Sequence, residues 1–194
     1  MKKNNFKKNF ILLAFLYFYF TTQIMSVNIG NKAPEVINAF IEIPSNSNIK
    51  YEFDKQNNII MVDRFLTVSM SYPANYGFIP ETQAKDGDPL DILVLTRFPV
   101  VPGCVIKSRP IGVLIMEDEA GLDEKIISVP DDKIDPYYKN IKELKDIPQI
   151  ELDKIHHFFE KYKDLEKGKW VKIKEYKDSK FAKELINLYK LNKK

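Results

Sequence analysis

Residues 92–129 read ILVLTRFPVVPGCVIKSRPIGVLIMEDEAGLDEKIISV, and this segment indicates the class of fold. It contains short runs of β-branched and aliphatic residues that predict strands at 92–96, 104–108, 111–116 and 125–129. Pro and Gly residues interrupt the runs at short intervals. Such short, closely spaced strands favour a small closed barrel over alternating strands and helices.

The residues before this segment predict more strands of the same kind. Ile37 to Ile43 and Ile49 to Phe53 are rich in β-branched and aromatic residues, and the turn-forming stretch 44–48 separates them. A third short strand is expected from Ile59 to Val62, after Asn57 and Asn58. The first two-thirds of the chain is therefore expected to be mostly β structure.

Helical patterns come late in the chain. Pro148 begins a segment that ends near Gly168, with apolar residues at a period near 3.6: Ile150, Leu152, Ile155, Phe158, Phe159 and Tyr162. A short strand from Trp170 to Ile173 follows. A second helix is expected from an N-cap at Asp178 or Ser179, and its apolar face is predicted to hold Phe181, Leu185, Leu188 and Tyr189. The predicted fold class is α+β, a small β-barrel with two late helices packed on it.

The first 24 residues differ from the rest of the chain. They contain four Lys, no acidic residue and an unbroken apolar run of 11 residues from Phe10 to Phe20. The run is shorter than the ~20 residues of a membrane-spanning helix but has the length of a signal-peptide core. A signal peptide, an anchor and a misassigned start before Met25 all remain open. We treat 1–24 as a leader and 25–194 as a single domain.

The charge balance excludes one large class of partner. The 194 residues include 30 basic and 27 acidic residues, a net charge of +3. The leader holds four of the basic residues, so the remainder has 26 basic against 27 acidic residues and a net charge of −1. Nucleic-acid binders carry a basic excess, so this composition argues against one. The single cysteine, Cys104, cannot form an internal disulfide or a cysteine-based zinc site.

Three aromatic or polar residues and Cys104 are expected to be structural. Cys104 is predicted to be a small buried strand residue, and Trp170 is predicted to lie in the core. His156 and His157 are interpreted as packing or subunit-contact residues rather than metal ligands.

An acidic turn is the most informative motif. Asp86-Gly87-Asp88-Pro89-Leu90-Asp91 precedes the apolar strand at 92–96. Three carboxylates so close together repel one another unless a cation or a proton lies among them. A rigid turn of oxygen ligands suits a hard divalent cation such as Mg²⁺, although a solvated acidic turn is the alternative.

A second acidic group lies at 117–124 and includes Asp118 and Asp123. By itself it reads as a solvated hairpin connection, but beside the first group it could complete a multi-metal site. Basic and phenolic residues precede the acidic turn. Lys50 and Glu52 share one face of their strand, which is either solvated or the mouth of an active site.

Seven motifs in order give a family resemblance. They are Glu42-Ile-Pro, Lys50-Tyr-Glu52, Asp63-Arg64-Phe, Tyr72-Pro-Ala-Asn-Tyr76-Gly, the acidic turn 86–91, the acidic segment 117–125 and the segment 157–170. In order and spacing they resemble the soluble family I inorganic pyrophosphatases of the bacterial type, over about residues 38–173. Lys161 stands where many members of that family have a second His.

The resemblance implies a fold, an activity and a set of roles. It implies a five-stranded barrel of the OB type and hydrolysis of pyrophosphate to two orthophosphates, driving biosynthetic reactions that release pyrophosphate. It implies several Mg²⁺ ions per site, a homohexamer and a cytoplasmic location. The roles implied are Asp88 as general base; Asp86, Asp91, Asp118 and Asp123 as metal ligands; Lys50, Arg64, Tyr76, Lys125, Tyr162 and Lys163 as phosphate-binding residues; and Glu42, Glu52 and Tyr72 as supporting residues.

Two readings from other classes compete with the enzyme. OB barrels often bind oligonucleotides, but that function predicts a basic groove, whereas the body of this chain is near neutral. A purely structural homologue would not need the acidic residues, and all of them are present.

Overall fold

The structure, a computed structural model, describes residues 27–191, so the leader expected over 1–24 lies outside the described residues. The first part of the described chain is made of strands: β1 (Ile37–Ile43), β2 (Ile49–Asp54), β3 (Ile59–Phe65), β4 (Asn75–Phe78), β5 (Asp91–Val94), β6 (Val105–Asp118) and β7 (Gly121–Pro130). Two 3-10 turns, η1 (Pro136–Tyr138) and η2 (Leu144–Asp146), precede α2 (Gln149–Lys161), β8 (Val171–Asp178) and α3 (Ser179–Tyr189). The expectation of a mainly β protein with two late helices is confirmed.

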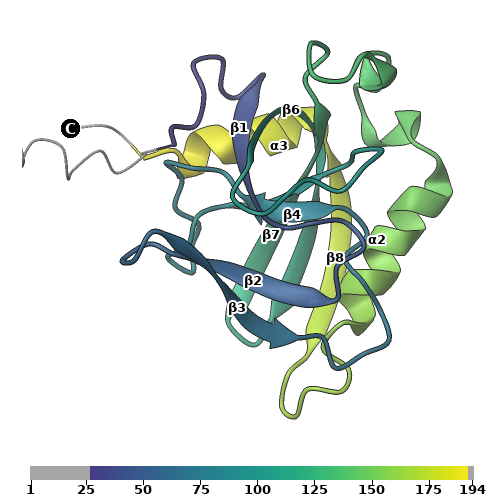
Figure 1. The fold of residues 1–194 in the computed structure, drawn as a ribbon. Helices are drawn as coiled ribbons and strands as arrows, with labels where there is room; N and C mark the ends of the chain where they lie inside the picture. Colours follow the sequence, from purple (N-terminus) through teal and green to yellow (C-terminus); the bar gives the residue numbers. More distant parts are fainter. Residues whose placement is uncertain (1–26, 192–194) are drawn as a thin grey trace, which may run out of the picture.

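Five strands form a closed ring of hydrogen-bonded pairs. The order is β1-β4-β5-β7-β6, and an additional pairing of β1 with β6 closes the ring, while β8 extends the sheet beyond β6. All of these pairs are antiparallel except β5 and β7, which are parallel. Strands β2 and β3 form a separate hairpin, which lies across the front of the ring in Figure 1.

The long strand β6 makes the closure possible. The sequence predicts two strands at 104–108 and 111–116, but the structure joins them into one strand of 14 residues. Its first residues pair with β1, and its later residues pair with both β7 and β8. Pro110 lies where the register with β7 shifts, which is where a strand tolerates a residue without an N–H group. Strand β6 therefore pairs with β1 as well as with β7, and these two pairings close the ring.

Strand β4 is absent from the sequence-based expectation. It is only four residues long and lies beside β1, where Gly77 faces Ile41. A Cβ atom at Gly77 would come within 1.8 Å of the carbonyl oxygen of Phe40. Only glycine allows the two backbones to approach this closely. Asn75 anchors the same strand, since its side chain is fully buried and its Oδ1 accepts from the N–H groups of Ser45 and Val100.

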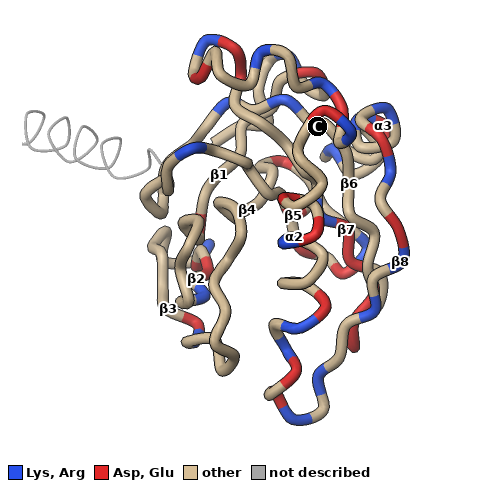
Figure 2. Tube along the Cα trace, turned by 90° about the vertical axis from the view of Figure 1, so that its right-hand side faces the viewer, with Lys and Arg blue, Asp and Glu red and all other residues tan. Residues whose placement is uncertain are grey.

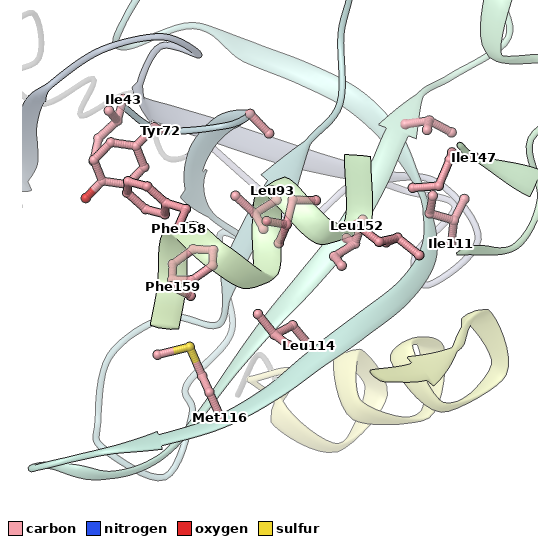
Figure 3. Close-up of a cluster of buried hydrophobic side chains, with 14 of the residues drawn as sticks. Ile43, Tyr72, Leu93, Ile111, Leu114, Met116, Ile147, Leu152, Phe158 and Phe159 are labelled. Atoms are coloured by element: carbon pink, nitrogen blue, oxygen red, sulfur yellow. The ribbon is translucent and has the colours of Figure 1, made fainter. Parts of the chain in front are cut away.

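Two apolar clusters pack the strands of the ring against the two helices. One joins the ring to α2, with Tyr72, Leu93, Leu114, Phe158 and Phe159 among its members (Figure 3). The other joins β1, β5 and β7 to α3 through residues such as Ala182, Leu185 and Ile186. Within residues 27–191, no helix is long and apolar enough to cross a membrane.

Several burial predictions are wrong. Cys104 is exposed and precedes β6, because the strand begins one residue later at the end of a turn. Trp170 is 46% exposed, because it lies in the connection that leads into β8 rather than beneath a helix. His156 and His157 are both exposed on α2, where the ring of His156 lies 6.4 Å from that of Tyr176, and their role in a subunit contact stays a prediction.

The faces of the helices also differ in part from the expected ones. Asp178, one of the two predicted residues, is the N-cap of α3, and its side chain accepts the N–H of Phe181. The buried face holds Ala182, Leu185, Ile186 and Tyr189, whereas Phe181 and Leu188 are exposed. Ile150 in α2 is likewise exposed. The error arises because apolar residues occupy two adjacent faces of each helix, and the periodicity does not say which face meets the ring.

Candidate active site

Two adjoining cavities bring the predicted site residues together. The larger cavity, of about 550 Å³, lies between the β2–β3 hairpin and the acidic turn. The smaller cavity, of about 280 Å³, lies between the hairpin, the β6–β7 connection and the end of α2. Lys50, Tyr76, Asp91 and Asp123 line both. The other predicted residues of the larger cavity are Glu42, Glu52, Asp86 and Asp88, and those of the smaller are Arg64, Tyr72, Asp118, Lys125, Tyr162 and Lys163.

Local hydrogen bonds fix the shape of the acidic turn. Gly87 has a φ of 95°, a conformation that favours glycine. The N–H of Asp88 donates to Oδ1 of Asp86 at 3.0 Å, and the N–H of Ala84 donates to the carbonyl oxygen of Asp88 at 2.7 Å. The side chain of Asp88 is 80% exposed and lies 3.8 Å from the ammonium of Lys55. Asp88 thus presents an accessible carboxylate at the mouth of the larger cavity.

Lys125 is the buried cation that joins the two cavities. Its side chain is 5% exposed and pairs with Asp91 and, at 2.7 Å, with Asp123. It also donates to the hydroxyl oxygen of Tyr76 at 3.0 Å. Burial by itself would lower the pKa of Lys125, but Asp91, Tyr76 and Asp123 outweigh it and hold the pKa well above its usual value. The ammonium is therefore charged near neutral pH.

A second buried lysine lies at the other end of the smaller cavity. Lys163, just past the end of α2, donates to Asp118 at 2.8 Å and to Glu119 at 3.2 Å. Burial would lower the pKa of Lys163, but Asp118 and Glu119 raise it overall. The hairpin connection between β6 and β7 places Asp118 and Asp123 on the same side of the ring, because Asp118 pairs with Gly121 and Met116 pairs with Asp123.

The β2–β3 hairpin carries the remaining basic residues over the site. Lys50 and Arg64 face each other across the hairpin, and both pair with Asp63, at 3.1 and 2.6 Å. Nε of Arg64 also donates to Glu166 at 3.2 Å. Lys50 pairs with Glu52, as their shared strand face predicts. Ion pairs thus hold both cations in place at the rim of the site.

The hairpin is anchored to the ring below it. The rings of Phe53 and Phe78 pack on Phe40, at 4.9 and 5.0 Å between centroids. The backbone N–H of Phe53 donates to Glu42 at 2.8 Å. Burial, the largest cause, raises the pKa of Glu42 to about 7 despite that hydrogen bond. Glu42 therefore both lines the larger cavity and anchors the hairpin beside it.

Two tyrosines complete the wall of the smaller cavity. The ring of Tyr72 lies 4.7 Å from that of Phe158, and the ring of Tyr162 stacks on the same residue at 5.3 Å. Burial raises the pKa of both hydroxyls, so both are neutral donors near neutral pH. The aromatic cluster under α2 thus positions hydroxyl groups at the site.

The donor set fits a hard divalent cation. Within residues 27–191, no three His, Cys, Asp or Glu side chains are arranged to hold a metal ion as they stand. The carboxylates instead face the ammonium groups of Lys125 and Lys163. Burial and the neighbouring Asp91 and Asp118 raise the pKa of Asp123, although Lys125 opposes them. Negative charge is thus concentrated among oxygen donors, which is the environment that Mg²⁺ prefers.

The sequence analysis missed residues that pair with the predicted ones. Lys55 approaches Asp88, Asp63 joins Lys50 to Arg64, Glu166 binds Arg64, and Glu119 joins Lys163 to Lys169. Asp63 and Glu166 lie within the recognised motifs, but nothing in their spacing marks them as partners of Arg64. In Figure 2, basic and acidic segments lie close together near β2, β5 and β7, in agreement with this pairing.

Comparison with known proteins shows the family. The model of the inorganic pyrophosphatase family matches residues 39–192. The chain belongs to the soluble family I inorganic pyrophosphatases. Among curated relatives, the inorganic pyrophosphatase of Sulfolobus acidocaldarius is 54% identical to this chain. The aligned region spans 84% of this chain and 95% of that relative. The inorganic pyrophosphatase of Campylobacter jejuni is 56% identical, and the aligned region spans 84% of this chain and 94% of that relative.

Solved structures agree with this assignment. The crystal structure of the inorganic pyrophosphatase from Thermus thermophilus has a TM-score of 0.81 and 46% identity, and covers 84% of this chain and 93% of that chain. The crystal structure of the inorganic phosphatase from Anaplasma phagocytophilum has a TM-score of 0.82 and 52% identity. It covers 84% of this chain and 96% of that chain. The pyrophosphatase is a hydrolase with inorganic pyrophosphatase activity, as the resemblance implies.

Proposed function

We propose that this pyrophosphatase hydrolyses pyrophosphate by general-base attack of water, with Asp88 as the base and several Mg²⁺ ions as cofactors. One observation supports this most strongly: exposed carboxylates and buried lysines in ion pairs line two cavities that share a wall. Pyrophosphate carries phosphoryl oxygens that need positive charge, while the attacking water needs an acceptor for its proton. The two cavities together supply both requirements.

In this proposal the carboxylates around the two cavities hold the metal. Asp86, Asp91, Asp118 and Asp123 are the ligands, and Glu52 and Glu42 support them. When bound, Mg²⁺ supplies charge neutralisation, polarises phosphoryl oxygens and lowers the pKa of water. Asp88 accepts a proton from the water that attacks phosphorus. Its exposed carboxylate suits that role, because a base must be free to accept.

The basic and phenolic residues hold the two phosphates. Arg64 offers a planar fork of N–H donors, and Lys50, Lys125 and Lys163 offer ammonium groups. Tyr76 and Tyr162 donate from hydroxyl groups, and Tyr72 packs behind them. These donors stabilise the charge that develops on the leaving phosphate as the P–O bond breaks. The water provides the new P–O bond, so no covalent enzyme intermediate is needed.

The proposal includes the fold and the setting of the enzyme. The ring of five strands is a closed barrel of the OB type, and residues 25–194 form one catalytic domain after a separable leader. The enzyme is a homohexamer in the cytoplasm, where biosynthesis releases pyrophosphate, and its partner is pyrophosphate rather than nucleic acid or membrane. The near-neutral charge of residues 25–194 supports the exclusion of nucleic acid.

Phosphate release from pyrophosphate tests the mechanism. With Mg²⁺ the enzyme is expected to release two phosphates per pyrophosphate, and with EDTA the release should stop and return when Mg²⁺ is added in excess. Undiminished release in chelator would contradict the metal-dependent mechanism. Size measurement of the native protein in solution tests the hexamer, and a monomeric mass would contradict it.

A further inference from the structure

The last turn of α3 contacts both segments that carry the proposed Mg²⁺ ligands. The hydroxyl of Tyr189 donates to Oε1 of Glu124 at 3.1 Å, and Glu124 lies between Asp123 and Lys125 on β7. The carbonyl oxygen of the same Tyr189 accepts the N–H of Gln83 at 2.9 Å, just before the acidic turn. One residue thus connects β7 to the entry of the turn 86–91.

Glu124 is an unusual neighbour for a metal site. Strand alternation points Asp123 and Lys125 into the cavities and Glu124 to the opposite side, toward α3. The residue is only 5% exposed, and its Oε2 is buried without a hydrogen-bond partner among the described residues. A buried carboxylate is costly unless it is hydrogen-bonded, so the Tyr189 hydroxyl is its critical donor.

Further bonds connect α3 to the acidic turn. Thr82 pairs with Lys190 across an antiparallel bridge, and the N–H of Leu191 donates to the carbonyl oxygen of Glu81. Thr82, which is buried, accepts the N–H of Leu90 with its hydroxyl at 2.9 Å. Leu90 precedes the ligand Asp91. The segment 81–84 is therefore hydrogen-bonded on one side to the residues at the end of α3. On the other side it is bonded to the acidic turn, at Asp88 and at Leu90.

The backbone of this segment is itself constrained. Glu81 has a φ of 56°, in the left-handed region that a residue with a side chain seldom adopts. Such a conformation persists only where the surroundings determine it, and it occurs most often close to functional sites. Here the hydrogen bond from the N–H of Leu191 to the carbonyl oxygen of Glu81 helps to hold that conformation.

We infer that Tyr189 is a positioning residue for the Mg²⁺ site, which holds Asp123 and the acidic turn in register by binding Glu124 on β7 and Gln83 before the turn. The inference rests on the proposed assignment of Asp86, Asp91 and Asp123 as ligands. Metal affinity depends on how well the ligands are pre-arranged, since groups that orient ligands affect it without touching the ion. The expected signature is a weaker Mg²⁺ affinity with unchanged chemistry once the metal is saturating.

Calorimetric titration of the full-length enzyme with Mg²⁺ alone tests this. Tyr189→Phe keeps the ring in the core and removes only the hydroxyl. We expect its Mg²⁺ dissociation constant to rise roughly three- to tenfold, the loss expected for one hydrogen bond. The Mg²⁺ concentration for half-maximal activity should rise in parallel, while kcat and KM for pyrophosphate at saturating Mg²⁺ stay at the wild-type values. An unchanged Mg²⁺ affinity in the folded variant would overturn the inference.

Tyr176→Phe is the matched control. Its hydroxyl donates to the carbonyl oxygen of Leu152 at 3.1 Å and joins β8 to α2, and it lines neither cavity. It should leave Mg²⁺ binding unchanged. An equal loss of affinity in this control would show general loosening of the fold and would overturn the specific role of Tyr189. If wild-type enzyme itself fails to bind Mg²⁺, the proposed function is wrong instead, so the two failures are distinguishable.

Substitutions at Glu124 test the same bond from the other side. Glu124→Met removes the acceptor at similar length and should weaken Mg²⁺ binding as Tyr189→Phe does, and the double variant should be no weaker than either single one. Glu124→Gln keeps an acceptor oxygen and loses the charge, so its Mg²⁺ affinity should stay close to the wild-type value. If Glu124→Gln binds Mg²⁺ as weakly as Glu124→Met, the charge and not the hydrogen bond is responsible, and the positioning role is refuted.

Discussion

The two cavities of the site treat their charges differently. In the larger cavity, carboxylates lie near solvent, with the side chain of Asp88 80% exposed and that of Glu52 57% exposed. In the smaller cavity, the side chains of Lys125 and Lys163 are 5% and 9% exposed and both are paired. Exposed charges are hydrated and contribute little to stability, whereas buried charges must keep their partners. Changes at the exposed carboxylates of the larger cavity should therefore affect chemistry alone, whereas changes at the buried lysines of the smaller cavity should affect folding as well.

The largest effect on rate is expected at an exposed carboxylate of the larger cavity. Asp88→Asn removes the proposed base and keeps its size, so kcat should fall by about 10²–10⁴-fold. The free energy of unfolding should stay within about 0.5 kcal/mol of the wild type, since the side chain is exposed. The measurements are steady-state phosphate release and denaturant unfolding. Asp153→Asn, on the exposed face of α2, is the control and should keep full activity. Wild-type activity in Asp88→Asn would remove Asp88 from the role of base.

The largest effect on stability is expected at the buried end. Lys125→Met leaves Asp91 and Asp123 without their buried partner, so the free energy of unfolding should fall by about 3–5 kcal/mol. Lys55→Met is the matched control in the larger cavity, because Lys55 is 60% exposed and its ion pair with Asp88 is long. That variant should change the unfolding free energy by less than about 0.5 kcal/mol. Equal stability of the two variants, measured by urea unfolding, would break the comparison.

A smaller effect is expected for a ligand shared by both cavities. Asp91→Ala removes one proposed metal ligand, so the Mg²⁺ concentration for half-maximal activity should rise by on the order of tenfold. Titration of activity against Mg²⁺ at fixed pyrophosphate measures it. An unchanged titration curve would exclude Asp91 as a ligand and leave it as a partner of Lys125 only.

The smallest effect is expected from the leader. Residues 1–24 contain none of the motif residues and lie outside the described part of the chain. An enzyme that begins at Met25 should therefore keep the wild-type kcat, KM and unfolding midpoint. A loss of activity or of stability on this deletion would show that the leader belongs to the catalytic domain.

Sequence reasoning succeeded where the signal is local. The bounds of β1 agree with the run Ile37–Ile43, and the N-cap Asp178 was recognisable three residues before the N–H that it accepts. All the predicted site residues line one of the two cavities. It failed for β4, whose four residues gain their strand conformation from pairing with β1 and β5 rather than from their own pattern.

Burial was the other weak point, for a similar reason. Leu188 and Ile150 are apolar and exposed, while the acidic Glu124 is buried against Tyr189. Hydrophobicity by residue type does not specify which face of a helix meets the sheet. The contact between Glu124 and α3 joins residues 65 positions apart, so no window of sequence shows it.

Local patterns in the chain predicted the mainly β fold and the two late helices, because turns, strand alternation and helical periodicity act over a few neighbouring residues. The roles of the site residues came from the family resemblance and stay predictions. Tertiary structure alone determined which charges pair and which are buried. Lys125 meets Asp91 across 34 residues because β5 and β7 pair side by side, and Lys163, just past α2, meets Asp118 across 45. Folding buries both ammonium groups away from water, and that desolvation is why their carboxylate partners matter.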